Sequence, residues 1–337
     1  MPALTLAQVM LFTVAVLALW KLGGVILLAF SSIALAIALR AVANGLSRAL
    51  RLPIRIAVIL SAALIFGVLA AVIGLYGWRI AAQYQQILDR IRETGRTALV
   101  YAQAQAWGPG LLTRAGALGV SDATDALAPA LGSVLTTSAR YLTYGAIVIV
   151  ASVFLALDPD RYVAGAVVLI PPAWRATGAE FLRSSSGVLR RWLVSRLIVM
   201  AAIGVLVSLG LTLLGIPSAV TLGLTGALLT FIPFIGALLA MVPAVLVALT
   251  VSPLLALAVA LMFWGVHFIE GTFITPMVQD DQVYLPPVIT IFATLTFTVV
   301  SGPSGVILAS PLVLVIIEGV RIFYLEGVLG EPVKPAR

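Results

Sequence analysis

Glu270 and His267 are the side chains of this sequence best placed to do chemistry. They lie three positions apart at the end of an apolar stretch, Leu254 to Glu270, so an α-helix would put them on one face. Ionisable groups inside a membrane segment are costly to bury and often functional. This pair is the candidate for coupling transport to an ion, by carrying H⁺ or binding a cation such as Na⁺. The favoured interpretation is a structural role, with Glu270 hydrated at a helix end or paired with an arginine.

Two Pro/Gly interruptions in the C-terminal half are the second candidate, at 232–236 and 301–305. Proline removes a backbone donor and glycine permits a tight reversal. Helix N-termini beginning near Ile235 and Ser304 would present partial positive charge, which suits anionic or hydroxyl-rich solutes. In the alternative interpretation these residues only allow close helix packing. The predicted solute-binding residues are Thr230, Pro233, Phe234, Gly236, Ser301, Gly302, Pro303, Ser304 and Gly305.

Arginines close to apolar segments form a third group. Arg190, Arg191 and Arg196 directly precede one such segment and could contact an anionic substrate or lipid phosphates. The positive-inside rule explains them equally well as anchors on the cytoplasmic side. Glu318 and Arg321, three positions apart, are expected to form an ion pair that closes the last helix.

Composition excludes most other functions. The chain is 62% hydrophobic and 10% charged, with no cysteine and one histidine. Thiol chemistry and multi-histidine metal sites are therefore ruled out, and we expect no metal and no cofactor. No Gly-x-Ser-x-Gly, His-Glu-x-x-His or P-loop motif occurs, so neither a hydrolase nor an ATP-driven pump is supported. The net charge of +7 comes from arginines beside apolar segments, which favours membrane lipids over nucleic acid as the partner.

The elements that would position these residues are helices in a membrane. A mean hydropathy of +1.16 and recurrent apolar runs predict an all-α, polytopic membrane protein. Val9–Trp20 and Gly24–Leu39 are read as a helical hairpin, and Ile56–Trp78 as the next span. The arginines from 40 to 55 place the intervening loop in the cytoplasm, and the hairpin then places the N-terminus there too.

The middle of the chain changes character. From 79 to 140 the sequence is mixed in charge and begins with an amphipathic helical pattern, so an extramembrane helical excursion is expected. Tyr141–Leu157 returns through the membrane, and the Arg-rich segment that follows indicates the cytoplasm again. Leu197–Leu214 then crosses outward.

Two pairs of short apolar segments follow. Ser218–Ile232 and Ile235–Thr250 are each about 23 Å long as helices, less than the ~30 Å of a hydrocarbon core. We interpret them as a re-entrant hairpin. Leu285–Val300 and Gly305–Glu318 form a second short pair, and the single span between the pairs would open them to opposite sides. Paired broken segments at membrane depth are typical of alternating-access transporters.

These segments divide the chain into five regions. They are membrane helices at 1–78, the extramembrane region at 79–140, membrane helices with an Arg-rich loop at 141–214, a hairpin-bearing transport region at 215–325, and a cytoplasmic tail at 326–337.

An ordered series of motifs resembles the autoinducer-2 exporter family of bacterial membrane proteins. The series is Leu214-Gly215-Ile216-Pro217, Ile232-Pro233-Phe234-Ile235-Gly236, Glu270-Gly271-Thr272-Phe273-Ile274-Thr275-Pro276, Pro286-Pro287 and Gly302-Pro303-Ser304-Gly305. The chain departs from the family at Thr272, where Asn is usual, and at Ser195-Arg196, where Gly-Gln is frequent. Substrate selection could therefore differ.

The resemblance implies an exporter of small polar solutes such as autoinducer-2, a quorum-sensing signal, in the bacterial cytoplasmic membrane. It also implies a homo-oligomer, for example a pentamer, and sodium–proton antiport in some relatives. Our leading hypothesis is a gradient-driven or passive transporter. A cation–proton antiporter that uses Glu270, and a scaffold that transports nothing, are the alternatives.

Overall fold

The computed structural model describes residues 6–72, 74, 138–233, 235–249, 251–279 and 285–330. All regular structure within these residues is helical, which confirms the all-α class. Four helices are long and apolar enough to cross a membrane, and they are Leu22–Leu50, Pro172–Leu213, Pro253–Val278 and Ser304–Glu326. Shorter apolar helices accompany them, so the chain is a multi-pass membrane protein.

The N-terminal region is one long helix and not the predicted hairpin. Helix α1 runs without a break over Leu6–Leu50, and α2 follows at Ile54–Val72. Gly23 and Gly24 do not reverse the chain, because a helix interior tolerates glycine at a cost of about 1 kcal/mol each. The two ends of α1 therefore lie apart. Because the predicted hairpin is absent, it no longer places the N-terminus on the same side of the membrane as the Arg-rich loop.

Helix α6, Ser138–Leu157, confirms the predicted return span and packs along α1 and α2. Arg40 of α1 donates a hydrogen bond to the carbonyl oxygen of Ala156 at 2.7 Å, so an arginine caps the C-terminal end of α6. Helix α7, Pro159–Val168, and the short helix η2, Pro172–Trp174, follow. The excursion predicted from 79 to 140 lies outside the described residues except for the first turn of α6.

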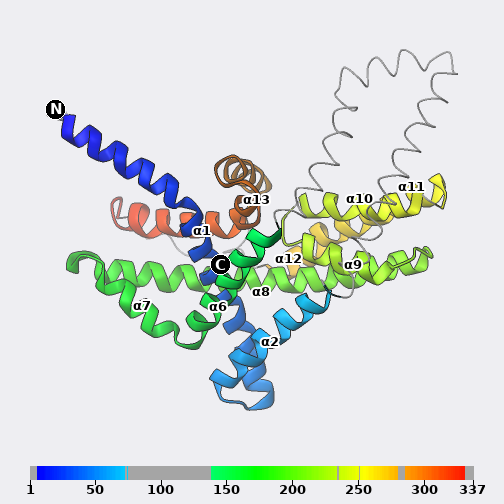
Figure 1. The fold of residues 1–337 in the computed structure, drawn as a ribbon, viewed down its shortest axis with the longest axis horizontal. Helices are drawn as coiled ribbons and strands as arrows, with labels where there is room; N and C mark the ends of the chain where they lie inside the picture. The colour runs from blue at the N-terminus through cyan, green and yellow to red at the C-terminus, as the bar shows by residue number, and fades with distance from the viewer. Residues whose placement is uncertain are drawn as a thin grey trace.

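Helix α8, Arg175–Leu213, extends along the middle of the molecule (Figure 1). It begins about six turns before the predicted Leu197, because the Arg-rich segment continues the helix instead of forming a loop. Its apolar half packs against α9 and α11 around Val199, Ile203 and Val207, all fully buried. A Cβ atom on Gly223 of α9 would lie 2.0 Å from the Ser208 Oγ, so small residues bring these two helices close together.

Helices α9, Ala219–Leu229, and α10, Ile235–Leu249, form the predicted short pair and pack against each other. The chain enters α9 through Gly215 and Ser218, which both have positive φ angles. At the other end the backbone N–H of Gly236 donates to the carbonyl oxygen of Ile232 at 3.0 Å, which closes the reversal. We call residues 230–236 the first tip.

Helix α11, Pro253–Ile269, starts at an N-cap where the Ser252 hydroxyl accepts a hydrogen bond from the Leu255 amide. The predicted helix end at Glu270 is wrong. A π-helical turn, η3 at Glu270–Ile274, leads directly into α12 at Thr275–Val278, so the helix continues past Glu270. Glu270 therefore lies within a long apolar helix, at a type of turn that is frequent at functional sites.

Helix α13, Pro287–Gly319, is a broken helix that continues as η4, Val320–Glu326. Its break is at Gly302, whose φ of 62° and ψ of −145° are accessible mainly to glycine. The two halves point in different directions: in Figure 1 the orange first half is seen nearly end-on and the red second half crosses the view. The second short pair is thus present as two helices that meet at a kink.

The end of the chain is tied back to α8. Arg321 forms ion pairs with Glu318 and with Glu326, the latter at 2.9 Å. The predicted pair is therefore present, and the Ser184 hydroxyl of α8 also donates a hydrogen bond to Glu318. This contact places the C-terminal half of α13 beside the N-terminal, Arg-rich half of α8.

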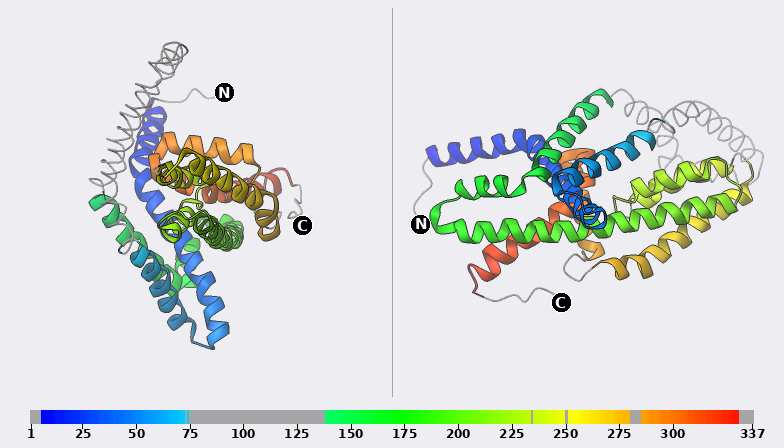
Figure 2. Two further views of the ribbon diagram at one scale, coloured as in Figure 1. Left: turned by 90° about the vertical axis from the view of Figure 1, so that its right-hand side faces the viewer. Right: turned by 90° about the horizontal axis from the view of Figure 1, so that it is seen from below.

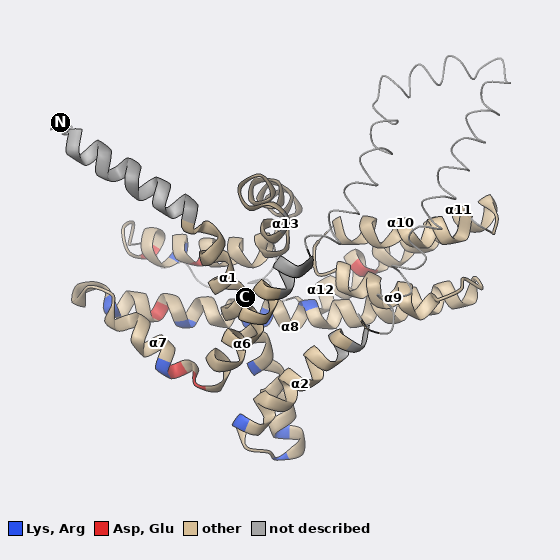
Figure 3. Ribbon diagram, viewed as in Figure 1, with Lys and Arg blue, Asp and Glu red and all other residues tan. Residues whose placement is uncertain are grey.

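Charged residues are unevenly distributed over the fold. In Figure 3 arginines gather on the N-terminal half of α8 and around the α1–α2 turn, α7 carries positive and negative charge side by side, and α9 to α11 carry few charges. Figure 2 shows from two other directions how α8 connects the Arg-rich end of the molecule with the end formed by α9 to α11. At the end formed by α9 to α11 charges are few, so a buried polar group there needs a specific explanation.

Candidate functional site

A cavity of about 390 Å³ lies where the first tip meets α8, η3 and α13. Four separate parts of the sequence line it, so it exists only because of the tertiary fold. The lining residues are Trp192, Arg196, Thr230, Ile232, Pro233, Ala237, His267, Glu270, Gly271, Thr275, Gln279, Leu285, Pro287, Thr290 and Ser310. We call it the solute cavity.

The Glu270 carboxylate has two partners in this cavity. One oxygen lies 3.6 Å from a guanidinium nitrogen of Arg196, and the other lies 2.6 Å from the His267 Nδ1. The side chains of Arg196 and Glu270 are only 7% and 14% exposed. Charges removed from water to this extent depend on each other, since each would be strongly unfavourable alone.

Arg196 also holds the first tip. Its guanidinium donates hydrogen bonds to the carbonyl oxygens of Thr230 and Phe231, the latter at 3.3 Å. These carbonyls follow the last turn of α9, where a helix has unpaired acceptors and a partial negative charge. One side chain therefore joins α8, the first tip and Glu270, and a change at any of the three would be transmitted to the other two.

Two polar atoms of the solute cavity lack a partner. The His267 Nε2 and the Ser310 Oγ are buried, and within the described residues neither has a hydrogen-bond partner. A buried polar group without a partner costs about 1–3 kcal/mol. Neither atom is accessible to water in this conformation, so a polar molecule in the cavity would supply the missing hydrogen bonds only after the surrounding helices move and open these atoms to it.

The predicted site residues are only partly brought together. Thr230, Pro233, His267 and Glu270 line the solute cavity. Gly236 is buried beside it at the start of α10. Phe234 and the side chain of Pro303 lie outside the described part of the structure. Among the described lining residues none comes from 301–305, so Ser301, Gly302, Ser304 and Gly305 are placed elsewhere on α13.

Instead, α13 contributes Thr290 from its first half and Ser310 from its second. No sequence pattern points to either residue, because hydroxyls are common in membrane helices and usually bind their own backbone, as the Thr290 hydroxyl does with the Pro286 carbonyl oxygen at 3.3 Å. The sequence predicts Arg196 to be an anchor or a contact to substrate or lipid, and the structure places it in a buried ion pair with Glu270. Its position at the start of an apolar run was a usable signal, since an arginine there needs a buried acidic partner.

Comparison with known proteins places this arrangement in context. Residues 7–324 match the family model described as "AI-2E family transporter". "Putative transport protein YrrI" of Bacillus subtilis (strain 168) is 30% identical over 143 residues, which are 42% of this chain and 40% of that protein. "Putative transport protein YueF" of the same organism is 24% identical over 193 residues, 54% of this chain and 51% of that protein. The matches thus span less than two thirds of either relative.

Proposed function

The chain belongs to the AI-2E transporter family, and from that premise we propose that it moves a small polar solute across the membrane by a gradient-driven or passive alternating-access mechanism. The observation that carries this proposal is the solute cavity with its unpartnered His267 Nε2 and Ser310 Oγ. Its volume of about 390 Å³ lies at the small end of the range for ligand sites. Autoinducer-2, for which the family is named, is the first solute to test.

The fold supports a moving first tip. Helices α9 and α10 are 11 and 15 residues long, shorter than a full crossing, and they end at irregular backbone that borders the solute cavity. The tip is held to α8 through the hydrogen bonds from Arg196. Rearrangement of this contact would open or close the cavity while α8 stays in place, with a solute or ion gradient as the source of energy.

Ser310→Ala is expected to reduce the apparent affinity for the transported solute about tenfold, because a hydrogen bond to a buried group contributes roughly 1–1.5 kcal/mol. The measurement is uptake of a panel of small polar solutes into liposomes containing the purified protein. Among the described residues the Ser310 hydroxyl has no hydrogen-bond partner, so its removal should not weaken the fold.

Ser61→Ala is the matched control, because Ser61 also has a buried hydroxyl without a partner but lies on α2, outside the solute cavity. Equal transport by the two variants would contradict a solute contact at Ser310. Absence of flux for every solute would instead favour the scaffold hypothesis.

A cation–proton antiporter is the second candidate, and the 2.6 Å contact between His267 and Glu270 favours it. Such a pair could exchange a proton for Na⁺ at the carboxylate. In the same liposomes, proton flux on addition of sodium, abolished by Glu270→Gln, would support the antiporter. No sodium-dependent flux, together with solute uptake, would support the solute transporter.

We further propose that the protein lies in the bacterial cytoplasmic membrane as a homo-oligomer, for example a pentamer, with its Arg-rich end in the cytoplasm. The Ser184–Glu318 hydrogen bond supports a C-terminus on that same side. The N-terminus is also proposed to lie in the cytoplasm, but this part of the proposal has no such contact behind it, because α1 is one long helix and not a hairpin.

A further inference from the structure

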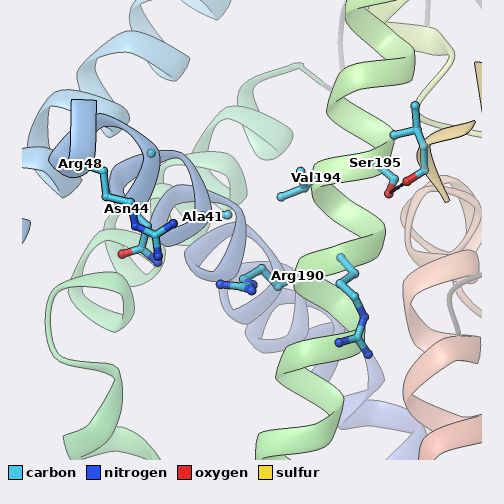
Figure 4. Close-up of a pocket in the computed structure, with 9 residues that line it drawn as sticks. Ala41, Asn44, Arg48, Arg190, Val194 and Ser195 are labelled. Carbon is cyan, nitrogen blue, oxygen red and sulfur yellow. Dashed lines mark hydrogen bonds between the residues drawn. The ribbon is translucent and has the colours of Figure 1, made fainter. Parts of the chain in front are cut away.

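A second pocket, of about 380 Å³, lies between α1 and the N-terminal half of α8, apart from the solute cavity. It is lined by Ala41, Asn44, Gly45, Arg48, Arg190, Arg191, Val194, Ser195 and Val278. Figure 4 shows the Arg190 side chain extending from α8 towards the stretch of α1 that carries Asn44 and Arg48. Two helices from distant parts of the sequence thus bring cationic groups into one hollow.

The pocket has a strong excess of positive charge. Three of its lining residues are arginines and none is acidic. Within the part of the chain that the structure describes, Arg48 and Arg190 form no ion pair and no hydrogen bond. Arg55, by comparison, lies 3.6 Å from Asp158. Arg48 and Arg190 therefore bring two exposed positive charges into one hollow, and an anion bound between them would reduce their mutual repulsion.

The pocket lies at the depth of lipid headgroups. Arg40 binds the carbonyl oxygens at the C-terminal end of α6, which marks where that apolar helix ends. Asn44 and Arg48 follow Arg40 along α1 by about 6 and 12 Å at 1.5 Å per residue. The headgroup layer extends roughly 5–8 Å beyond the hydrocarbon core on each side. If the end of α6 marks the edge of the hydrocarbon core, the polar end of the pocket would lie at and just beyond the phosphates.

We propose that this pocket binds a phosphate-bearing anion, namely the headgroup of an anionic phospholipid. Arginine guanidinium groups match phosphate oxygens in geometry and charge, and the Asn44 amide adds a further hydrogen-bonding group. Ala41 and Val194 give the pocket an apolar wall that suits the glycerol and upper acyl chain. The positive-inside rule alone requires arginines on this side, but it does not require them to share a pocket.

The site would border the solute cavity. Ser195 and Val278 line the pocket, while the next residues, Arg196 and Gln279, line the solute cavity. The Ser195 hydroxyl donates a hydrogen bond to the Val278 carbonyl oxygen at 2.9 Å, so this contact forms part of the wall between them. Lipid binding at this pocket would not depend on which solute is transported.

The test is lipid retention by the purified full-length protein, measured by native mass spectrometry with phosphatidylglycerol and phosphatidylcholine as probes. Both lipids carry a phosphate, but only phosphatidylglycerol has a net negative charge. We expect phosphatidylglycerol to bind at least about tenfold more tightly. Substitution of both Arg48→Gln and Arg190→Gln should reduce its affinity about a hundredfold, or tenfold for each charge-assisted hydrogen bond lost.

The matched control is the pair Arg161→Gln and Arg183→Gln, which removes the same charge from positions that are exposed, as Arg48 and Arg190 are, but lie outside the pocket. Retention of parent affinity by the Arg48/Arg190 variant, or an equal loss in the control, would overturn the site. Inorganic phosphate and glycerol 3-phosphate form the second arm. If millimolar amounts of either displace phosphatidylglycerol, the site binds a soluble phosphate and the lipid assignment is wrong. Unchanged elution from gel filtration verifies that each variant is folded.

Discussion

Arg196→Met is expected to destabilise the protein by about 3–5 kcal/mol, the cost of breaking a buried ion pair by removing one partner. Methionine has a similar volume, so the loss would come from electrostatics and not from a cavity. The Glu270 carboxylate, 14% exposed, would keep only His267 as a partner. The carbonyl oxygens of Thr230 and Phe231 would lose their donor at the same time. Thermal and denaturant unfolding of the purified protein in detergent would measure the change.

The double variant Arg196→Met with Glu270→Gln separates the two contributions. If the ion pair dominates, removal of both charges should recover most of the lost stability, because no buried charge then remains alone. If capping of the first tip dominates, the double variant should stay as unstable as Arg196→Met. Arg183→Met, on the same helix but exposed, should change the free energy of unfolding by less than about 0.5 kcal/mol. A similarly small change for Arg196→Met would contradict the role of this residue.

Hydropathy predicted the spans well because burial in lipid depends on local sequence. The short pair α9–α10, the break at Gly302 and the return span α6 all lie where the sequence indicates them. The wrong predictions concern positions where the same residues can either end a helix or lie inside one. Gly23-Gly24 and Glu270 both resemble helix ends, yet α1 and α11–α12 pass through them. Glycine and a single charge weaken a helix in water, but in a membrane the backbone has no other hydrogen-bonding partner.

The site was less predictable, because its members meet only in the tertiary structure. His267 and Glu270 could be paired from their spacing, and the structure confirms that contact. Arg196 lies 74 positions before Glu270, and no local pattern connects the two. Ser310 contributes a group whose importance is that it has no partner, which a sequence does not reveal.

The departure from the family pattern at Ser195-Arg196 gains a physical meaning. Ser195 binds the Val278 carbonyl oxygen, and Arg196 binds the first tip and Glu270. The other departure, Thr272, is exposed and does not line the solute cavity. We therefore expect the residues at 195 and 196, more than Thr272, to account for any difference in solute selection between this chain and other members.

Gly236→Ala is expected to destabilise the protein by about 1–3 kcal/mol, the usual cost of overpacking, although it adds only one methyl group. That methyl would lie 1.9 Å from the Leu229 carbonyl oxygen and 3.0 Å from the Thr230 Cα. Both are backbone atoms, so the clash can be relieved only by moving the first tip. Because the Arg196 guanidinium is hydrogen-bonded to the Thr230 carbonyl oxygen, the movement should also disturb the ion pair with Glu270 and reduce transport.

Gly265→Ala is the matched control, since a Cβ atom at this position in α11 meets nothing within 4 Å. It should leave stability unchanged or raise it by up to about 1 kcal/mol, because alanine favours a helix more than glycine does. Equal stability of the two variants would show that the first tip is not closely packed. Gly305→Ala extends the comparison, because its Cβ atom would lie 2.0 Å from the Phe297 carbonyl oxygen. If Gly305→Ala loses as much stability as Gly236→Ala but still transports, the kink of α13 is as closely packed as the first tip. Only the first tip would then serve the solute cavity.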